Sequence, residues 1–270
     1  MASRIASRRS CWSMREALLL TAALLVAPVA HAQAGADARR SGITYATPST
    51  QALQQDDSQN PAMLWVADGR VAWNKVDGEA RKACADCHGK IESMRGVAPR
   101  YPAVAAASQR VVNLGQQINQ CRSTRQRAPA LAAESDALLA LETAIAFESR
   151  GMAIAPSQPA PAALKQAQAR GKALFHERIG HVALSCHDCH DTLAGKRLGA
   201  AVIPQGHATG YPIYRLEWQK VGSLQRRLRN CMTAVRAETP AWGAQELVDL
   251  EAWLMLRAAG MPLETPGVRP

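Results

Sequence analysis

The feature that most constrains this chain is a five-residue motif that occurs twice, as CADCH at residues 84–88 and as CHDCH at residues 186–190. Cys-x-x-Cys-His is the attachment sequence of c-type haem, in which two thiols bond to the porphyrin and the His ligates the iron. A zinc site would need four thiolates close together, but about a hundred residues separate the two pairs. A thioredoxin-like dithiol would need a strand–helix context, which is missing here. The sequence therefore predicts two covalently bound haems, the first held by Cys84, Cys87 and the iron ligand His88, the second by Cys186, Cys189 and the iron ligand His190.

The two motifs occupy corresponding places in an internal repeat. GRVAW (69–73) precedes the first motif as GKALF (171–175) precedes the second, with fifteen residues from Gly to Cys in both. VVNLGQQINQC (111–121) aligns with VGSLQRRLRNC (221–231) at a constant offset of 110. Self-similarity of this kind indicates two copies of one structural unit.

The end of each unit has helical periodicity. LLALETAIAFESRGM (138–152) aligns with LVDLEAWLMLRAAGM (247–261), and the apolar residues of 137–147 and 246–256 recur at helical intervals, without sustained alternation. We predict a mainly α fold made of two tandem, class I-like c-type cytochrome domains related by the repeat.

The N-terminal residues are typical of a secretory signal. Four Arg precede the apolar run ALLLTAALLVAPVA (17–30), and Ala30-His31-Ala32 supplies a cleavage site. An uncleaved membrane anchor is the alternative. Cleavage would place the mature chain in the periplasm, outside the cytoplasm, where haem is attached. The predicted organisation is a signal peptide (1–32), a loose polar N-terminal arm (33–60), a cytochrome domain with haem 1 (61–155), a Pro-rich linker (156–163) and a cytochrome domain with haem 2 and the active site (164–270).

Charge and composition narrow the function. The net charge of +10 falls to +7 when four Arg and one Glu leave with residues 1–32. The remaining basic residues are not clustered as on a nucleic-acid-binding face, so we expect an anionic substrate or an acidic protein partner, no nucleic acid, and no membrane attachment after signal removal. With only two Phe and four Tyr, the chain has few aromatic residues to fill cores, and planar cofactors would fill that space.

Each haem iron needs a sixth ligand or keeps an open site. Cys121 and Cys231 occupy equivalent places in the repeat, which predicts two symmetric thiolate ligands, one per iron. The alternatives are a Cys121–Cys231 disulfide or methionine ligands, for which the candidates are Met94, Met152, Met232 and Met261.

The two cysteine-bearing segments differ in charge. Four residues before Cys121 stands Gln117, whereas four before Cys231 stands Arg227, and residues i and i+4 share one face of a helix. Arginine suits oxyanions, and nearby positive charge favours thiolate over thiol. Arg226 and Arg229, which align with Gln116 and Asn119 of the first unit, fit a solvated basic helix face. We therefore predict that the second unit holds the reaction site and that the first is a relay or a structural remnant.

The chain resembles the SoxA family, the dihaem cytochromes of the SoxAX complex in periplasmic sulfur oxidation. The resemblance covers nearly the whole mature sequence. It rests on CADCH, NQCR (119–122), APALAAESDALLAL (128–141), SRGM (149–152), LSCHDCHDTLAGKRLG (184–199), IPQGHATGYPIYRLEWQ (203–219), SLQRRLRNCMTAVRAE (223–238) and ETPGVRP (264–270).

This resemblance implies His and Cys ligands on both irons: His88 and Cys121 for haem 1, His190 and Cys231 for haem 2. It also implies that Cys231 is a cysteine persulfide intermediate and that Arg227 contacts the substrate. The implied enzyme is an L-cysteine S-thiosulfotransferase, which couples thiosulfate to a cysteine of the SoxY subunit of the SoxYZ carrier and passes two electrons on. The implied partners are the monohaem cytochrome SoxX as a heterodimer, SoxYZ, and a soluble cytochrome c as electron acceptor.

Three other functions use similar parts. A thiosulfate dehydrogenase that forms tetrathionate also couples sulfurs beside a haem. A non-catalytic dihaem electron carrier would explain the haems but not the difference between Gln117 and Arg227. A dihaem peroxidase would need a displaceable ligand, and paired cysteine ligands argue against it.

Overall fold

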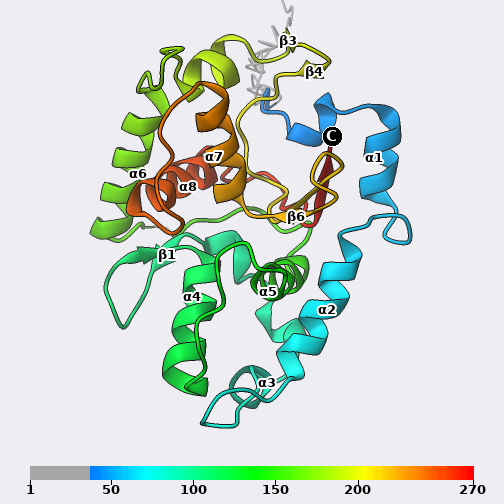
Figure 1. The fold of residues 1–270 in the computed structure, drawn as a ribbon, viewed down its shortest axis with the longest axis vertical. Helices are drawn as coiled ribbons and strands as arrows, with labels where there is room; N and C mark the ends of the chain where they lie inside the picture. The colour runs from blue at the N-terminus through cyan, green and yellow to red at the C-terminus, as the bar shows by residue number, and fades with distance from the viewer. Residues whose placement is uncertain (1–36, 158) are drawn as a thin grey trace, which may run out of the picture. The chain divides into compact units, whose positions relative to one another are not determined.

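Helices dominate the computed structural model, which describes residues 37–157 and 159–270 (Figure 1). Residues Arg39–Pro270 form one compact unit. The signal peptide expected over residues 1–32 lies outside the described residues. Among the residues that are described, we find no helix with the length and apolarity needed to cross a bilayer.

The first repeat contains four helices and a short hairpin. The elements are α2 (Met63–Asn74), α3 (Ala85–His88), β1 (Ala103–Val104), β2 (Val111–Val112), α4 (Leu114–Cys121) and α5 (Asp136–Phe147). The motif CADCH forms α3 with its preceding turn, and Cys121 is the last residue of α4. Short 3-10 and π-helical turns at 91–94, 98–100 and 122–126 join these elements.

The second repeat has the same order of elements with additional strands. They are α6 (Ala162–His176), a π-helical turn (Asp188–Thr192), β3 (Arg197–Leu198), β4 (Ala201–Val202), β5 (Ile213–Arg215), β6 (Lys220–Gly222), α7 (Leu224–Ala234), α8 (Gln245–Arg257) and β7 (Gly267–Arg269). β3 pairs antiparallel with β4, and β5 lies between β6, antiparallel, and β7, parallel. The helices expected within 137–147 and 246–256 are confirmed as α5 and α8.

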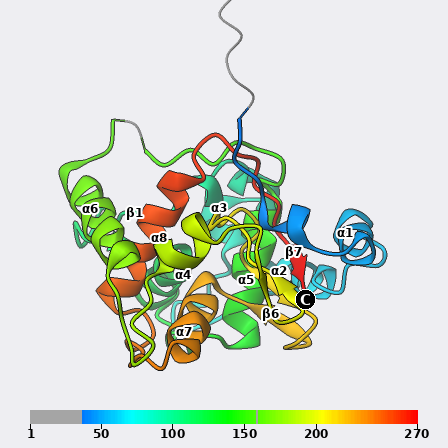
Figure 2. The same cartoon turned by 90° about the horizontal axis from the view of Figure 1, so that it is seen from above.

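The repeat is preserved in the packing. α2 packs along α5 as α6 packs along α8, and Figures 1 and 2 both place the last two side by side. Gly69 and Gly171 are equivalent, and a Cβ at either position would collide with the backbone carbonyl of Ala140 or Asp249 on the partner helix. This close approach explains why both aligned segments contain a glycine. The hairpins also keep their register, because Ala103 opposes Val112 as Ile213 opposes Gly222.

The two repeats share a core. Ala98 and Ala146 of the first repeat pack in one buried cluster with Phe175 and Leu250 of the second. A backbone bridge also joins Ala153 to Pro262. The boundaries between the two cytochrome domains remain a prediction, and the observed unit buries apolar side chains from both repeats together.

Part of the polar N-terminal arm is helical instead of loose. A 3-10 turn (Gly42–Tyr45) leads into α1 (Pro48–Gln55), which is capped by Thr47. The Gln54 side chain then accepts a hydrogen bond of 2.9 Å from the backbone N–H of Val268 in β7. Polar composition suggested an unpacked segment, but the cap and the contact with the C-terminal strand order it.

Candidate functional site

Helix α7 sets the position of the second cysteine. It begins after Ser223, whose hydroxyl accepts a hydrogen bond of 3.2 Å from the backbone N–H of Arg226. Leu224, Leu228 and Met232 pack against the shared core and fix the rotation of the helix. Arg227 and Cys231, four residues apart, therefore lie on the same side of α7.

His190 faces Cys231 in a defined orientation. Its Nδ1 lies 2.8 Å from the carbonyl oxygen of Pro204, and a carbonyl can only accept, so Nδ1 carries a proton. The His190 side chain also forms a hydrogen bond with the Cys231 sulfur. A backbone carbonyl that holds one imidazole nitrogen, while the other faces the metal position, is the usual support of a metal-ligating histidine.

Positive charge surrounds the Cys231 sulfur. Burial alone would raise the pKa of this thiol, but His190, then Arg227 and Arg215, hold the pKa below its usual value. The neighbouring motif thiols behave in the opposite way: burial raises the pKa of Cys186 to about 11, and burial also raises that of Cys189. The site thus stabilises the thiolate at Cys231 in preference to the two motif cysteines.

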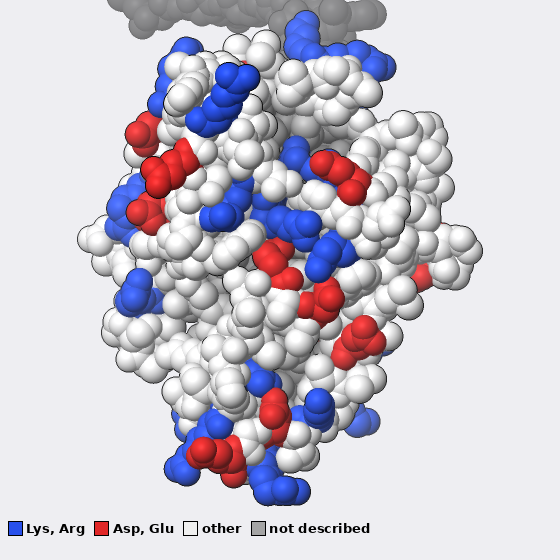
Figure 3. All heavy atoms as spheres, in the orientation of Figure 1, with Lys and Arg blue, Asp and Glu red and all other residues white. Residues whose placement is uncertain are grey.

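Arg215 is a site residue that the sequence analysis did not single out. Its Nε donates 2.7 Å to the carbonyl of Pro270, and its Nη2 pairs with Glu217 at 2.9 Å. Its Nη1 is buried with no acceptor in the described part of the chain. Arg215 lies in the quoted segment IPQGHATGYPIYRLEWQ, and its aligned residue in the first repeat is Ala105, a replacement that could have revealed it. On the face drawn in Figure 3, Lys and Arg gather across the middle, where Figure 1 shows α7 and β6.

The first cysteine has a neutral neighbour. Gln117 Nε2 donates to the Cys121 sulfur at 3.4 Å, where the second repeat has Arg227. Arg122, directly after Cys121, is buried and bound to Asp77 at 2.8 Å, so its charge is already paired. His88 is exposed beside the Trp73 ring, with the ring centroids 5.8 Å apart. In the described residues no hydrogen bond joins His88 to Cys121.

The alternatives to two cysteine ligands were a Cys121–Cys231 disulfide and methionine ligands to the iron. Each of the six cysteines in the described part of the chain is free, so a Cys121–Cys231 disulfide is not present. Met261 is buried in the shared core, Met232 packs against it, and Met94 packs against the core of the first repeat. These methionines therefore have packing roles in this structure.

The second centre fits a c-type haem. His190 and Cys231 face each other, and Cys186 packs at the edge of the shared core. At Gly206 a Cβ would come within 3.3 Å of the Cβ of His190, so a side chain there would press on this residue. The unpaired Nη1 of Arg215 offers a donor to an anionic group. The first centre offers the same residue types, with Cys84 at the edge of its own apolar cluster.

Comparisons with known proteins identify the family and the fold of this chain. The family model described as SoxA/TsdA, cytochrome c domain, matches residues 68–154 and 170–263, one segment in each repeat. The L-cysteine S-thiosulfotransferase subunit SoxA of Rhodovulum sulfidophilum is 34% identical over 86% of this chain and 81% of its own. The protein of the same name from Pseudaminobacter salicylatoxidans is 34% identical over 85% of this chain and 80% of its own.

A solved structure has the same fold. The crystal structure of SoxXA from P. pantotrophus contains a chain that superposes with a TM-score of 0.82 at 31% identity, covering 86% of this chain and 87% of that one. The mainly helical fold and the cytochrome c family expected from the sequence are confirmed, and cytochrome c domains imply c-type haem. The paired Cys-x-x-Cys-His motifs, the two matched segments and the relatives matched over most of their length together establish that this chain belongs to the SoxA family of c-type cytochromes.

Proposed function

We propose that this chain is the dihaem subunit of an L-cysteine S-thiosulfotransferase, which joins thiosulfate to a cysteine of the SoxY subunit of a SoxYZ carrier. The observation that carries this proposal is the Cys231 sulfur, which faces His190 and lies beside Arg227 and Arg215. The names of the relatives support the same activity. The proposed setting is the periplasm, with a SoxX-type monohaem cytochrome as partner and a soluble cytochrome c as electron acceptor.

The reaction forms one sulfur–sulfur bond and releases two electrons. The carrier thiol loses its proton, its sulfur bonds to the outer sulfur of thiosulfate, and a cysteine S-thiosulfonate results. Two sulfurs that are both nucleophiles cannot join without an electron acceptor. Two c-type haems, held by Cys84, Cys87, Cys186 and Cys189, would accept electrons one at a time and pass them on.

The residues around Cys231 bind and orient the reactants. Arg227 and Arg215 offer cationic N–H donors to the sulfonate oxygens, and each charge-assisted hydrogen bond contributes roughly 1.5–3 kcal/mol. The Pro204 carbonyl holds the His190 ring so that its second nitrogen faces the Cys231 sulfur, and these two side chains would hold the haem iron. In the proposal Cys231 carries a persulfide, and the outer sulfur of this persulfide bonds to the outer sulfur of thiosulfate as the two electrons leave. The carrier thiolate then takes over the thiosulfate group and releases the persulfide of Cys231 unchanged. The same cations favour the anionic form of this sulfur.

A reconstituted assay tests the proposal. The purified dihaem protein with its monohaem partner is mixed with thiosulfate, SoxYZ carrier and oxidised cytochrome c. We expect cytochrome c reduction that requires the carrier, and a carrier whose mass increases by one thiosulfate group. Reduction without the carrier, accompanied by tetrathionate, would instead favour a thiosulfate dehydrogenase.

A further inference from the structure

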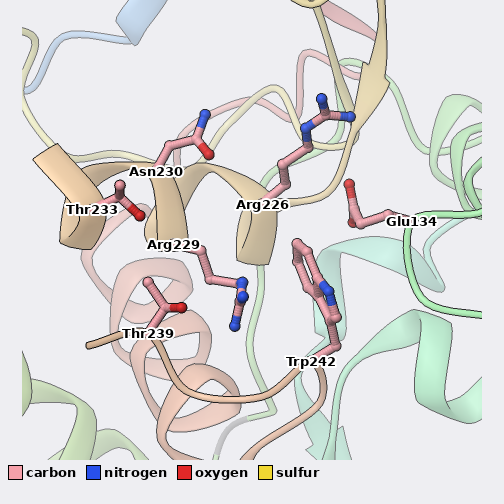
Figure 4. A pocket seen from close by; sticks show the side chains of 7 residues that line it. All are labelled: Glu134, Arg226, Arg229, Asn230, Thr233, Thr239 and Trp242. Atoms are coloured by element: carbon pink, nitrogen blue, oxygen red, sulfur yellow. The ribbon is translucent and has the colours of Figure 1, made fainter. Parts of the chain in front are cut away.

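A pocket of roughly 340 Å³ opens on the outer side of α7. Its walls come from both repeats: Glu134 precedes α5, Arg226, Arg229, Asn230 and Thr233 belong to α7, and Thr239 and Trp242 lie in the following loop (Figure 4). The pocket residues of α7 are spaced at three and four positions and share one face. Successive helix residues are turned by about 100°, so this face lies beside the one that carries Arg227 and Cys231.

Two arginines in this pocket are held by aromatic rings. The guanidinium of Arg226 lies 4.3 Å from the centre of the Trp218 ring, and that of Arg229 lies 4.4 Å from the centre of Trp242. Arg229 also donates to the carbonyl of Pro240. The Arg226 guanidinium has no hydrogen-bond acceptor within residues 37–157 and 159–270. Stacking fixes the direction of both groups and leaves N–H donors for a bound carboxylate.

The equivalent face of α4 is closed. Asn119, aligned with Arg229, makes two hydrogen bonds with the backbone of Leu131, at 2.9 and 2.8 Å. Gln116, aligned with Arg226, donates 3.0 Å to the carbonyl of Gly243. Asn119 thus ties α4 to the loop that follows it, and Gln116 ties α4 to the α7–α8 loop of the second repeat. On α7 both amides are replaced by stacked arginines around an opening.

We propose that this pocket binds an acidic segment of the carrier protein that brings its cysteine to Cys231, an inference that rests on the proposed function. Three features favour a protein segment. The pocket is larger than a single oxyanion needs, Trp242 presents 40% of its surface, and tryptophan with arginine is typical of interface centres. The Glu134 carboxylate accepts from the backbone N–H of Ser223 at 3.4 Å and can accept backbone N–H groups of a peptide in the same way.

The pocket is also placed to guide the carrier. Arg226 directly precedes Arg227, and Asn230 directly precedes Cys231. Trp218 links the pocket to the site. Its ring contacts Arg226 of the pocket and also Arg215 of the site, whose guanidinium lies 5.1 Å from the ring centre. A segment held here would keep a carrier cysteine near the sulfur without occupying the place of thiosulfate.

The test compares the wild-type holoprotein with Arg226→Gln/Arg229→Asn, which copies the first repeat. Lys196→Gln/Arg197→Gln, on the exposed β3–β4 hairpin, is the control with the same loss of charge. Binding of a hexaglutamate peptide is measured by calorimetry at low ionic strength, with sulfate as competitor. The KM values for carrier and thiosulfate are measured in the reconstituted assay.

We expect the pocket variant to weaken peptide binding at least roughly tenfold and to raise the carrier KM by a similar factor. Its kcat and thiosulfate KM should stay within about twofold, and the control should match the wild type. Equal peptide affinity in all three proteins would overturn the proposal, as would an unchanged carrier KM. Displacement of the peptide by equimolar sulfate would make the pocket a small-anion site and also overturn it. If the wild type does not use the carrier at all, the proposed function is wrong. Peptide binding that does not depend on Arg226 and Arg229 would contradict the proposal for the pocket, whatever the result with the carrier.

Discussion

Helices α4 and α7 carry equivalent cysteines, Cys121 and Cys231, whose surroundings differ in charge. The Cys121 sulfur accepts from the Gln117 amide, and the position aligned with Arg215 is the buried Ala105. The Cys231 sulfur lies near both Arg227 and Arg215. The common features of the two helices suit a metal ligand, whereas the added cations suit an anionic substrate. Comparison of the repeats therefore separates the residues proposed to hold an iron from those proposed to act on the substrate.

Removal of either sulfur should give the largest difference. Cys231→Ala should lower carrier-dependent thiosulfate oxidation by at least roughly a thousandfold, because the reacting sulfur is lost. Cys121→Ala should keep activity within about tenfold of wild type. The assay is cytochrome c reduction at matched haem content. Equal losses would mean that both sulfurs are only ligands, and the electron-carrier function would then be favoured.

Replacement of Arg227, four residues before Cys231, should give the next largest loss of activity. Arg227→Gln copies Gln117 of the first repeat and should lower kcat/KM for thiosulfate by roughly 10- to 100-fold, the scale of one charge-assisted hydrogen bond. The reciprocal Gln117→Arg should remain near wild type, because no reaction is expected at Cys121. Steady-state kinetics with saturating carrier measures both. Full activity of Arg227→Gln would show that α7 attracts partners only.

Two aligned acids predict a pH effect on stability. Burial raises the pKa of Glu251 to about 8, well above the 4.5 of an ordinary glutamate. The folded state therefore holds this proton more tightly than the unfolded chain, and stability is lost as the pH rises from about 4.5 towards 8. Glu251→Gln should raise Tm at about pH 8.5 and change it little near pH 5. The corresponding gain in the free energy of unfolding at pH 8.5 should be about 2 kcal/mol.

Glu142 provides the matched comparison for this effect. Its pKa is also raised to about 8, first by burial and then by the charge of Glu251. However, Glu142 is only half-buried, whereas Glu251 is 5% exposed. Glu142→Gln should therefore give the smaller pH-dependent change in Tm. A larger change in Glu142→Gln would contradict this ranking of the two repeats.

A glycine in α4 gives the smallest predicted effect. A Cβ at Gly115 would collide with the Oε1 atom of Glu142, whereas the aligned residue in α7 is Gln225. Gly115→Ala should lower the free energy of unfolding by about 1–2 kcal/mol in urea titrations. Addition of Glu142→Ala should recover part of this loss because it removes the colliding atom. An unchanged unfolding midpoint in Gly115→Ala would indicate that the Glu142 side chain moves aside freely.

The local signals in the sequence account for most of this fold. The helices α5 and α8 follow from apolar spacing, and the alignment of the repeats anticipates the equivalent positions of Gly69 and Gly171. The helical arm over 48–55 was missed, because its order depends on a contact with β7 at the other end of the chain.

The sequence predicted those parts of the candidate site that lie on the repeated helices. The placement of Arg227 relative to Cys231 followed from helical spacing, and the repeat alignment paired Cys121 with Cys231. Arg215 and the Pro204 carbonyl are brought to the site by loops and strands, so no periodicity points to them. The pocket beside α7 was also missed, since Trp242 reaches Arg229 only through the turn that follows the helix.

The central claim is that the reacting sulfur belongs to α7 and not to α4. Peptide mass spectrometry of the purified protein, after mild alkylation and digestion, locates any added sulfur atom directly. We predict an added sulfur on the peptide that contains Cys231 and none on the peptide that contains Cys121. An added sulfur on Cys121, or its absence from Cys231 in fully active protein, would contradict this account.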